Sequence, residues 1–305
     1  MNNPTKAYMQ NLFDTLKEYQ LSGNWDNSNN LIWKNAEQIR HYLYSFKISG
    51  ADNSFIKPYV DDALARFFHT IDIIARQKKE GKLLEIGSNP YLLTILVKKF
   101  FDYKITMTNY FDISIYGSHV KKGSQIIKSE EYNEEFEFEF FDLNIELSKL
   151  PFEVNEFDVI LFCEVLEHII VKPLDIFSKL KDILKKDGIL LITTPNAVRL
   201  INFAHMIEGY NFFDRYHTNN GVYGRHNREF TITEIEKILI ENKFKIIYSE
   251  TLDRYNYNET SMFVDSYDTQ VRLPYTRDSL IKILKAINGE ILNRGDNIYV
   301  VAENY

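Results

Sequence analysis

The amino-acid sequence predicts an α/β protein with one open, twisted and mostly parallel sheet, helices on both of its faces, and a helical N-terminal cap. Two patterns lead to this prediction. Before Gly81, apolar residues recur at three- and four-residue steps, as amphipathic helices require. After Gly81, short apolar runs alternate with helical segments, which is typical of βαβ units. With 305 residues, 45% of them hydrophobic, the chain can bury a complete core.

The part of the chain before Gly81 is expected to be helical. The predicted helices cover Tyr8–Tyr19, Leu31–Ile48 and Tyr59–Lys79, and a stretch rich in Asn, Asp, Ser and Gly separates the first two. We assign residues 1–57 to the cap and residues 58–305 to the main domain. Such helices can cover an active site or form the contact of a homodimer, and periodicity does not separate these two roles.

Seven strands are expected in the main domain, at Lys82–Ile86, Lys104–Asn109, Glu135–Phe141, Phe157–Cys163, Ile189–Thr194, Lys245–Glu250 and Asn297–Ala302. Helices are expected between them, at Leu92–Phe101, Leu174–Leu184 and Thr233–Asn242. Two stretches interrupt the alternation, at about 203–229 and 253–278. We expect these stretches to be lid insertions rather than a separate domain.

Composition and charge exclude several classes of protein. The chain has 36 basic and 43 acidic side chains, and the resulting charge of −7 argues against broad binding to a nucleic-acid backbone. Cys163 is the only cysteine, so no intrachain disulfide is expected, which suits the reducing cytoplasm. No apolar run approaches the roughly 18 residues of a membrane helix. The spacing of the seven histidines predicts no metal site. We expect a cytoplasmic protein with no nucleic-acid or membrane partner.

A glycine turn follows the first predicted strand. The strand ends at Glu85 and Ile86, and Gly87 and Ser88 lead into a helix that begins near Tyr91. Such a turn lets a ligand approach the backbone at the carboxyl end of a strand. A pyrophosphate site would have further glycines, so the turn favours a nucleoside ligand without a pyrophosphate. By itself the motif is equally consistent with an ordinary strand-to-helix turn.

Three later segments favour a ligand-binding turn over an ordinary strand-to-helix turn. Phe141–Asn144 closes the third strand, Phe157–Ile169 contains the fourth strand and its Glu-Val-Leu-Glu-His exit, and Leu184–Asn196 supplies the fifth strand. In this order the motifs resemble the class I S-adenosylmethionine-dependent methyltransferases, specifically their bacterial small-molecule type, over about 59–304. Residues 221–231 are also similar to a segment of one bacterial branch of that family. The resemblance implies a Rossmann-like fold, S-adenosylmethionine as cofactor, and methyl transfer to oxygen or nitrogen of a small-molecule or sugar-containing acceptor.

The resemblance also implies which residues hold the cofactor. In the family the glycine turn lies against the methionine portion and its acid orders the turn, the residue matching Asp142 accepts a hydrogen bond from the adenine amino group, and the next residue packs on the ring. The two residues that end the fourth strand line the cleft. The implied cofactor-binding residues are Glu85, Gly87, Ser88, Asn109, Asp142, Leu143, Cys163 and Glu164.

One of these positions departs from the family pattern. The family usually has an acid at the end of the second strand, which holds both ribose hydroxyls, whereas this chain has Asn109. An amide cannot accept two charge-assisted hydrogen bonds as a carboxylate does. The departure implies weaker cofactor binding or help from Asp112. The alternative is that Asn109 only caps a turn.

Two histidines are candidates for acid–base or orienting work on the acceptor. His168 follows the fourth strand at the edge where the sheet meets ligands, and His226 lies in a polar cluster within the first insertion. Nearby Arg225 and Arg228 can grip a phosphate, a carboxylate or sugar hydroxyls. Alternatively, His168 keeps a loop rigid, and Asn227–Thr231 caps the helix that begins near Thr233 while Arg225 and Arg228 are solvated.

Aromatic residues of the same insertion are candidates for substrate contact. Tyr210 and Tyr223, with Tyr216 and His217, are suited to an aromatic wall against an amphipathic acceptor. Because aromatic residues are so common in this chain, packing of the lid itself is the alternative that each of them favours when taken singly. Two other functions stay open. A nucleic-acid methyltransferase would show an Asn/Asp-Pro-Pro-aromatic exit from the fourth strand. A non-catalytic binding partner would keep the fold without binding the cofactor.

Overall fold

The structure is a computed structural model that describes residues 3–22, 25–77, 80–111, 119–170, 173–213, 222–254, 263–266, 269–272 and 274–305. The chain forms two compact units. Unit 1 consists of Met1–Asp112, Tyr116–Leu161 and Asp182–Leu190, and unit 2 of Ile113–Ile115, Phe162–Lys181 and Leu191–Tyr305. The predicted boundary at residue 57 is a different division of the chain and stays a prediction.

The described residues contain one nine-stranded sheet, with the strand order β1-β4-β5-β3-β2-β6-β7-β11-β8. Its strands are β1 (Lys47–Ile48), β2 (Glu80–Ile86), β3 (Asp102–Asn109), β4 (Val120–Ser129), β5 (Glu134–Leu143), β6 (Phe157–Cys163), β7 (Leu184–Pro195), β8 (Phe244–Leu252) and β11 (Asn297–Asn304). The pairs β2–β3 and β3–β5 are parallel, whereas β1–β4, β4–β5 and β8–β11 are antiparallel. This mixed sheet confirms the predicted α/β fold.

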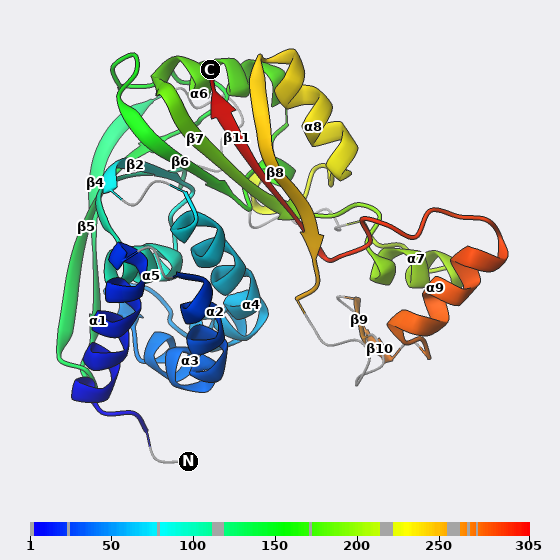
Figure 1. The fold of residues 1–305 in the computed structure, drawn as a ribbon, viewed down its shortest axis with the longest axis horizontal. Helices are drawn as coiled ribbons and strands as arrows, with labels where there is room; N and C mark the ends of the chain where they lie inside the picture. Colours follow the sequence, from blue (N-terminus) through cyan, green and yellow to red (C-terminus); the bar gives the residue numbers. More distant parts are fainter. Residues whose placement is uncertain are drawn as a thin grey trace. The chain divides into compact units, whose positions relative to one another are not determined.

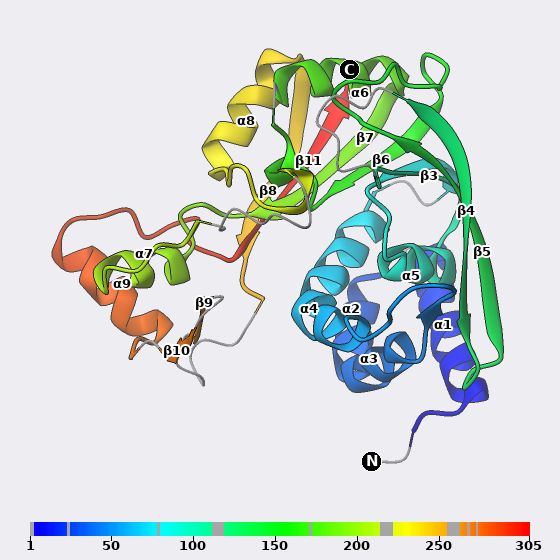
Figure 2. The ribbon, with the colours of Figure 1, turned by 180° about the vertical axis from the view of Figure 1, so that it is seen from behind.

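The sheet has two strands more than the sequence predicts. All seven expected strands are present, and the additions are β1 and β4. β4 is mostly exposed and contains Lys, Gly, Ser and Gln, so its sequence has no apolar run that marks a strand. Its pairing is supplied by the long hairpin with β5, in which Ile127 lies opposite Phe136. Figure 2 shows this hairpin beside α1 (Lys6–Ser22).

The predicted helix Leu31–Ile48 is wrong in its extent. The structure has two helices there, α2 (Trp25–Lys34) and α3 (Ala36–Tyr44), and the segment ends in β1. The break falls at Asn35, whose amide donates to the carbonyl of Leu31 at 2.8 Å and whose side-chain oxygen accepts from the Tyr8 hydroxyl. A side chain that bonds its own backbone competes with the helix, so Asn35 ends one helix and starts the next.

The remaining helices of unit 1 are α4 (Ile56–Ala75) and α5 (Leu92–Phe100), and Figure 1 shows α1–α4 gathered beside α5. Phe13 of α1 joins these helices. Its ring centroid lies 5.5 Å from that of Phe100 and 5.0 Å from that of Tyr42, and the side chain is 2% exposed. Helices α1 and α3 therefore share one aromatic core with α5, the helix between β2 and β3.

We expect Phe13→Ala to lower the free energy of unfolding by about 3–5 kcal/mol, because it removes a buried aromatic ring and leaves a cavity. Urea denaturation followed by circular dichroism measures this change. Leu21→Ala on the same helix is the control, since Leu21 is 60% exposed and its truncation should change stability by less than about 0.5 kcal/mol. Equal effects of the two substitutions would contradict the packing described for α1.

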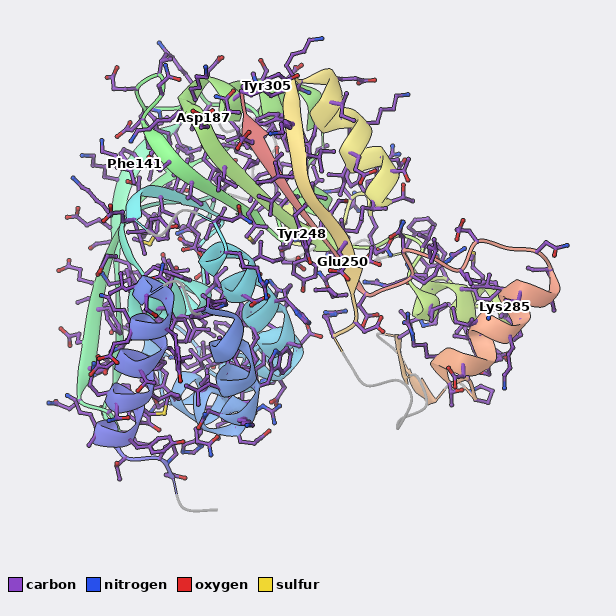
Figure 3. The ribbon with its side chains drawn as sticks, in the orientation of Figure 1. Phe141, Asp187, Tyr248, Glu250, Lys285 and Tyr305 are labelled. Carbon is purple, nitrogen blue, oxygen red and sulfur yellow. The ribbon has the colours of Figure 1, made fainter. Side chains whose placement is uncertain are left out.

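Unit 2 contains α6 (Pro173–Ile183, whose last two residues belong to unit 1), α7 (Leu200–Ile207), α8 (Ile232–Glu241), α9 (Arg277–Ala286) and a strand pair, β9 (Phe263–Ser266) and β10 (Thr269–Arg272). α7 and α9 share a small apolar core of Leu200, Ala204, Leu280 and Leu284. Figure 3 shows Tyr248 and Glu250 close together on β8, where the tyrosine hydroxyl donates to the carboxylate at 2.6 Å.

No helix in the described part of the chain is long and apolar enough to cross a membrane.

Candidate functional site

The glycine turn of unit 1 has the conformation that its sequence predicts. β2 ends at Ile86, and Gly87 then takes a φ of +73°, a left-handed value that favours glycine. The N–H of Gly87 donates to the carbonyl of Thr108 at 2.8 Å, which ties the turn to the end of β3. The Ser88 N–H bonds to the same carbonyl at 3.3 Å. The backbone of the turn is thus held by the neighbouring strand and has no side chain at its first position.

Asn109 holds this turn from within the protein. Its side-chain oxygen accepts hydrogen bonds from the N–H of Asn89 at 2.9 Å and the hydroxyl of Ser88 at 3.2 Å. Its side-chain nitrogen donates to the Tyr91 hydroxyl at 3.0 Å, and the residue is buried. These contacts favour the alternative in which Asn109 caps the turn. They also give Ser88 a role in the same scaffold.

Glu85 links the strand to the helix that follows the turn. The Thr94 hydroxyl of α5 donates to Glu85 Oε2 at 2.6 Å, and the carboxyl group is buried. Burial raises the pKa of Glu85 to about 7, although the bond from Thr94 works in the opposite direction. Glu85 therefore orders the first turn of α5 through a direct side-chain bond.

The raised pKa of Glu85 makes stability depend on pH. Below about pH 4.5 the group is protonated in both states, and between 4.5 and 7 the folded protein keeps a proton that the unfolded chain releases. Stability therefore falls as pH rises through this window, by roughly 3 kcal/mol in total. We expect Glu85→Gln to remove this slope. Urea unfolding of both proteins at pH 4.5, 6 and 7.5 tests it, and a stability difference that does not change with pH would contradict it.

The predicted adenine-binding residue Asp142 has a partner that sequence analysis does not identify. His119 Nε2 lies 3.2 Å from Asp142 Oδ2, and the Phe111 N–H donates to Oδ1 at 3.2 Å. The β4–β5 register brings them together, since β4 starts directly after His119 and Lys121 faces Asp142. No signal in the sequence indicates this pair, because β4 itself is not predicted. Leu143 next to Asp142 is buried, and Asp112 lies outside the described residues.

In unit 2, the end of β6 carries a strained residue. Glu164 has a φ of +53°, which is uncommon for a residue with a side chain and is typical of functional sites. Its carboxylate accepts from the Thr193 hydroxyl at 2.8 Å and from the Asn297 amide at 3.0 and 3.1 Å. Cys163 before it is half-buried. Thr193 and Asn297 are hydrogen-bond donors to Glu164 that sequence analysis does not identify, because they come from other strands of the sheet.

Both predicted catalytic histidines belong to one cluster in unit 2. Their ring centroids lie 5.2 Å apart, with the rings nearly perpendicular. Glu167 completes the cluster, with its Oε1 4.0 Å from His168 Nε2, and it is only 1% exposed. Burial and the charge of Glu164 raise the pKa of Glu167. Sequence analysis does not identify Glu167 as a site residue. The spacing of the histidines along the chain also gives no sign that His168 and His226 meet in space, and the absence of a metal site stays a prediction.

Each histidine of the cluster has a hydrogen-bond acceptor at Nδ1. For His168 the acceptor is the carbonyl of Arg225, at 2.8 Å, and for His226 it is Oε1 of Glu229, at 3.1 Å. Glu229 is itself bound by Arg199 at 3.0 Å, and His226 and Arg199 keep the pKa of this carboxyl low despite its burial. These acceptors make Nδ1 the donor atom of each ring and fix the ring orientation.

The two arginines of the predicted substrate grip have different surroundings. The side chain of Arg225 is half-buried and donates to Asn227 at 2.9 Å. Arg228 is exposed and donates to Glu234, which forms a capping box with Thr231 at the start of α8. For Arg228 the structure therefore supports the capping alternative rather than substrate contact.

The structure describes only two of the four residues of the predicted aromatic wall. Tyr223 is half-buried in the short turn η2 (Val222–Gly224), whereas Tyr210 is 44% exposed beyond the end of α7. Tyr216 and His217 lie outside the described residues. The roles of Tyr210 and Tyr223 in binding an acceptor stay predictions.

Comparison with known proteins shows the family of the chain. Residues 53–249 match the family described as "Methyltransferase domain", so the chain belongs to that methyltransferase family. Its cofactor is S-adenosylmethionine, as the resemblance implies. No curated protein sequence matches the chain.

Several solved structures are similar to the chain at low sequence identity. A SAM-dependent methyltransferase from Archaeoglobus fulgidus is 13% identical, with a TM-score of 0.48 over 81% of this chain and 99% of that one. A methyltransferase from Haloferax volcanii, solved with the Trm112 methyltransferase activator, is 12% identical, with a TM-score of 0.48 over 83% and 96%. A Thermotoga maritima protein described as a possible histamine N-methyltransferase is 13% identical, with a TM-score of 0.46 over 82% and 97%.

Proposed function

We propose that this chain is an active methyltransferase that transfers a methyl group to oxygen or nitrogen of a small-molecule or sugar-containing acceptor. The observation that carries the proposal is the cluster of Glu167, His168 and His226, in which both imidazoles have a hydrogen-bond acceptor at Nδ1 and a lone pair at Nε2. A protein that kept the fold only for assembly would have no need of two histidines that are both oriented by an acceptor at Nδ1.

The residues of unit 1 fit S-adenosylmethionine. Gly87, at a φ of +73°, offers a backbone surface with no side chain, which suits close approach of a ligand. Asp142 keeps a carboxylate 21% exposed at the end of β5, although part of its hydrogen-bonding capacity is used by His119 and Phe111. The side chain of Asn109 is hydrogen-bonded to the turn, so it would support cofactor binding indirectly, by keeping that turn rigid.

When bound, S-adenosylmethionine supplies an electrophilic methyl group on a sulfonium; the carbon–sulfur bond breaks as the methyl bonds to the acceptor, and S-adenosylhomocysteine is left. The acceptor must also lose a proton if it is a hydroxyl or a protonated amine. The cluster in unit 2 is suited to this part of the reaction, because an imidazole Nε2 with its lone pair can orient or deprotonate such a group. Glu229 would stabilise the charged form of His226 that results.

Three observations bear on the two other candidate functions. The exit of the fourth strand is Cys163–Leu166, without the Asn/Asp-Pro-Pro-aromatic motif for a flipped base, and the charge of −7 opposes binding to a nucleic acid. The binding-partner alternative is favoured by Asn109, since no carboxylate stands at the position expected to hold the ribose. It predicts a folded protein that does not bind the cofactor.

Calorimetric titration with S-adenosylmethionine and, separately, S-adenosylhomocysteine tests the proposal. We expect one-to-one binding with a micromolar dissociation constant. The loaded protein would then be screened against sugars, phenols and amines, with release of S-adenosylhomocysteine as the readout. Absence of binding by a folded, ligand-free sample would contradict the proposal and support the binding-partner alternative.

A further inference from the structure

The cluster of Glu167, His168 and His226 has the geometry of a metal-binding site. Each residue offers one ligand atom, and these three atoms lie within 4.8 Å of one another. Within this group, Glu167 Oε1 lies 4.0 Å from His168 Nε2. Two ligands of a tetrahedral ion with bonds near 2.0–2.1 Å are about 3.3 Å apart, so small side-chain rotations would complete the site.

Each imidazole is supported in the way that metal-bound histidines are. A ligating histidine usually donates its other N–H to a carbonyl or carboxylate, which orients the ring and fixes the tautomer. The carbonyl of Arg225 does this for His168, and Glu229 does it for His226. Glu229 is in turn bound by the Arg199 guanidinium and by the Asn202 amide at 3.2 Å. Nε2 is therefore the ring atom through which each histidine would bind an ion.

The carboxylate is supported in the same way. Glu167 Oε2 accepts from the Thr194 hydroxyl at 2.8 Å, which leaves Oε1 as the atom nearer to His168. The two chain segments are also fastened to each other by backbone bonds. The N–H groups of Asn227 and Arg228 donate to the Glu167 carbonyl at 2.7 and 3.2 Å, and the Asn227 amide donates to the His168 carbonyl at 2.9 Å. The ligand set is thus preorganised without an ion.

The burial of the carboxylate also favours a cation. Glu167 is only 1% exposed. A carboxylate at such a position needs a compensating positive charge or hydrogen bonds. A divalent ion would provide that charge directly at Glu167.

We propose that Glu167, His168 and His226 bind one divalent transition-metal ion of the Zn²⁺ or Co²⁺ type through Oε1 and the two Nε2 atoms. Two imidazoles and one carboxylate suit these ions, whereas Mg²⁺ and Ca²⁺ prefer all-oxygen ligand sets. Three protein ligands leave at least one coordination position open, as in catalytic rather than structural sites. With the ion bound, its open position, rather than an Nε2 lone pair, would act on the acceptor oxygen, whose pKa the ion would lower. This last role rests on the proposed methyl transfer, but the binding of the ion does not.

Titration of the chelator-treated, full-length protein with ZnCl₂, followed by calorimetry, tests the site. We expect one ion per chain, and an absorption band near 500–650 nm when CoCl₂ replaces ZnCl₂. His226→Ala should weaken Zn²⁺ binding at least 100-fold, and Glu167→Gln should do so while keeping the shape of the buried side chain. His41→Ala, on α3 in unit 1, is the matched control and should bind Zn²⁺ like the unaltered protein. MgCl₂ at the same concentration should give no saturable heat.

Thermal unfolding keeps the result interpretable if a variant is destabilised. Zn²⁺ should raise the midpoint of the unaltered and His41→Ala proteins but leave that of His226→Ala unchanged. Zn²⁺ affinity that is equal in all variants would mean adventitious surface binding and would overturn the proposal, as would no binding at all. S-adenosylmethionine titrated onto the metal-free protein separates the two proposals. Cofactor binding without Zn²⁺ binding contradicts only the metal site, and Zn²⁺ binding without cofactor binding contradicts only the methyl-transfer function.

Discussion

Gly87→Val is expected to weaken S-adenosylmethionine binding by at least about 100-fold, equivalent to roughly 2.7 kcal/mol. Gly87 has a φ of +73°, and its N–H is fixed to the Thr108 carbonyl, so the turn cannot move away without losing that bond. A branched side chain at this position would project from the backbone surface that the family uses for the methionine portion of the cofactor. Calorimetric titration of the variant measures the loss directly.

A branched residue at a positive φ is strained wherever it occurs, so this prediction needs a control for backbone strain. Gly50 in the same unit has a φ of +79°, and a Cβ added there would meet no atom within 4 Å. Gly50→Val should therefore be destabilised by a similar amount but bind the cofactor like the unaltered protein. A folded Gly87→Val protein whose affinity lies within threefold of the unaltered protein would remove the glycine turn from the cofactor site.

His168→Asn is expected to lower turnover at least tenfold while S-adenosylmethionine affinity stays nearly unchanged. The amide of Asn can replace the hydrogen bond that His168 Nδ1 donates to the Arg225 carbonyl, but it has no atom at the position of Nε2. The substitution therefore separates support of the loop from action on the acceptor. Turnover is measured as S-adenosylhomocysteine release with the acceptor that the screen identifies, and cofactor affinity by calorimetry.

The control for this prediction is His41→Asn, which changes a histidine of α3 that contacts Glu131 at 3.4 Å and has no place in either site. It should leave turnover unchanged. If His168→Asn also retained full turnover, His168 would act only on the conformation of its loop, as the alternative interpretation of the sequence holds. A fall in cofactor affinity equal to the fall in turnover would point to the same conclusion.

The arrangement of strands and helices was largely predictable because its signals are local. Alternating apolar runs located all seven expected strands, and β6 has the bounds that the sequence predicts. The glycine turn could also be predicted from the sequence, because an apolar strand that ends in an acid and a glycine is a recognisable local pattern. The errors arose where a side chain or a partner strand determined the backbone. Asn35 interrupts an otherwise continuous helical pattern, and β4 depends on its hairpin partner rather than on its own composition.

The site was only partly predictable for the same physical reason. His168 and His226 could be named as polar residues near strand ends or within an insertion, but their contact depends on backbone bonds from Asn227 and Arg228 to Glu167. The pairing of His119 with Asp142 depends on the β4–β5 register. Arg228 could have served either a substrate or a helix cap, and its bond to Glu234 at the start of α8 favours the cap.

By itself, the sequence determined the α/β class, the strand-end motifs and the methyltransferase family, because periodicity and turn chemistry act over a few neighbouring residues. Only the tertiary structure decided that Asn109 supports a turn, that Glu167 is buried beside Thr194, and that the Nδ1 atoms of His168 and His226 meet the Arg225 carbonyl and Glu229. These properties depend on which donors and acceptors the fold brings within about 3 Å of one another, and hydrogen-bond partners far apart in the chain leave no periodic signal in it.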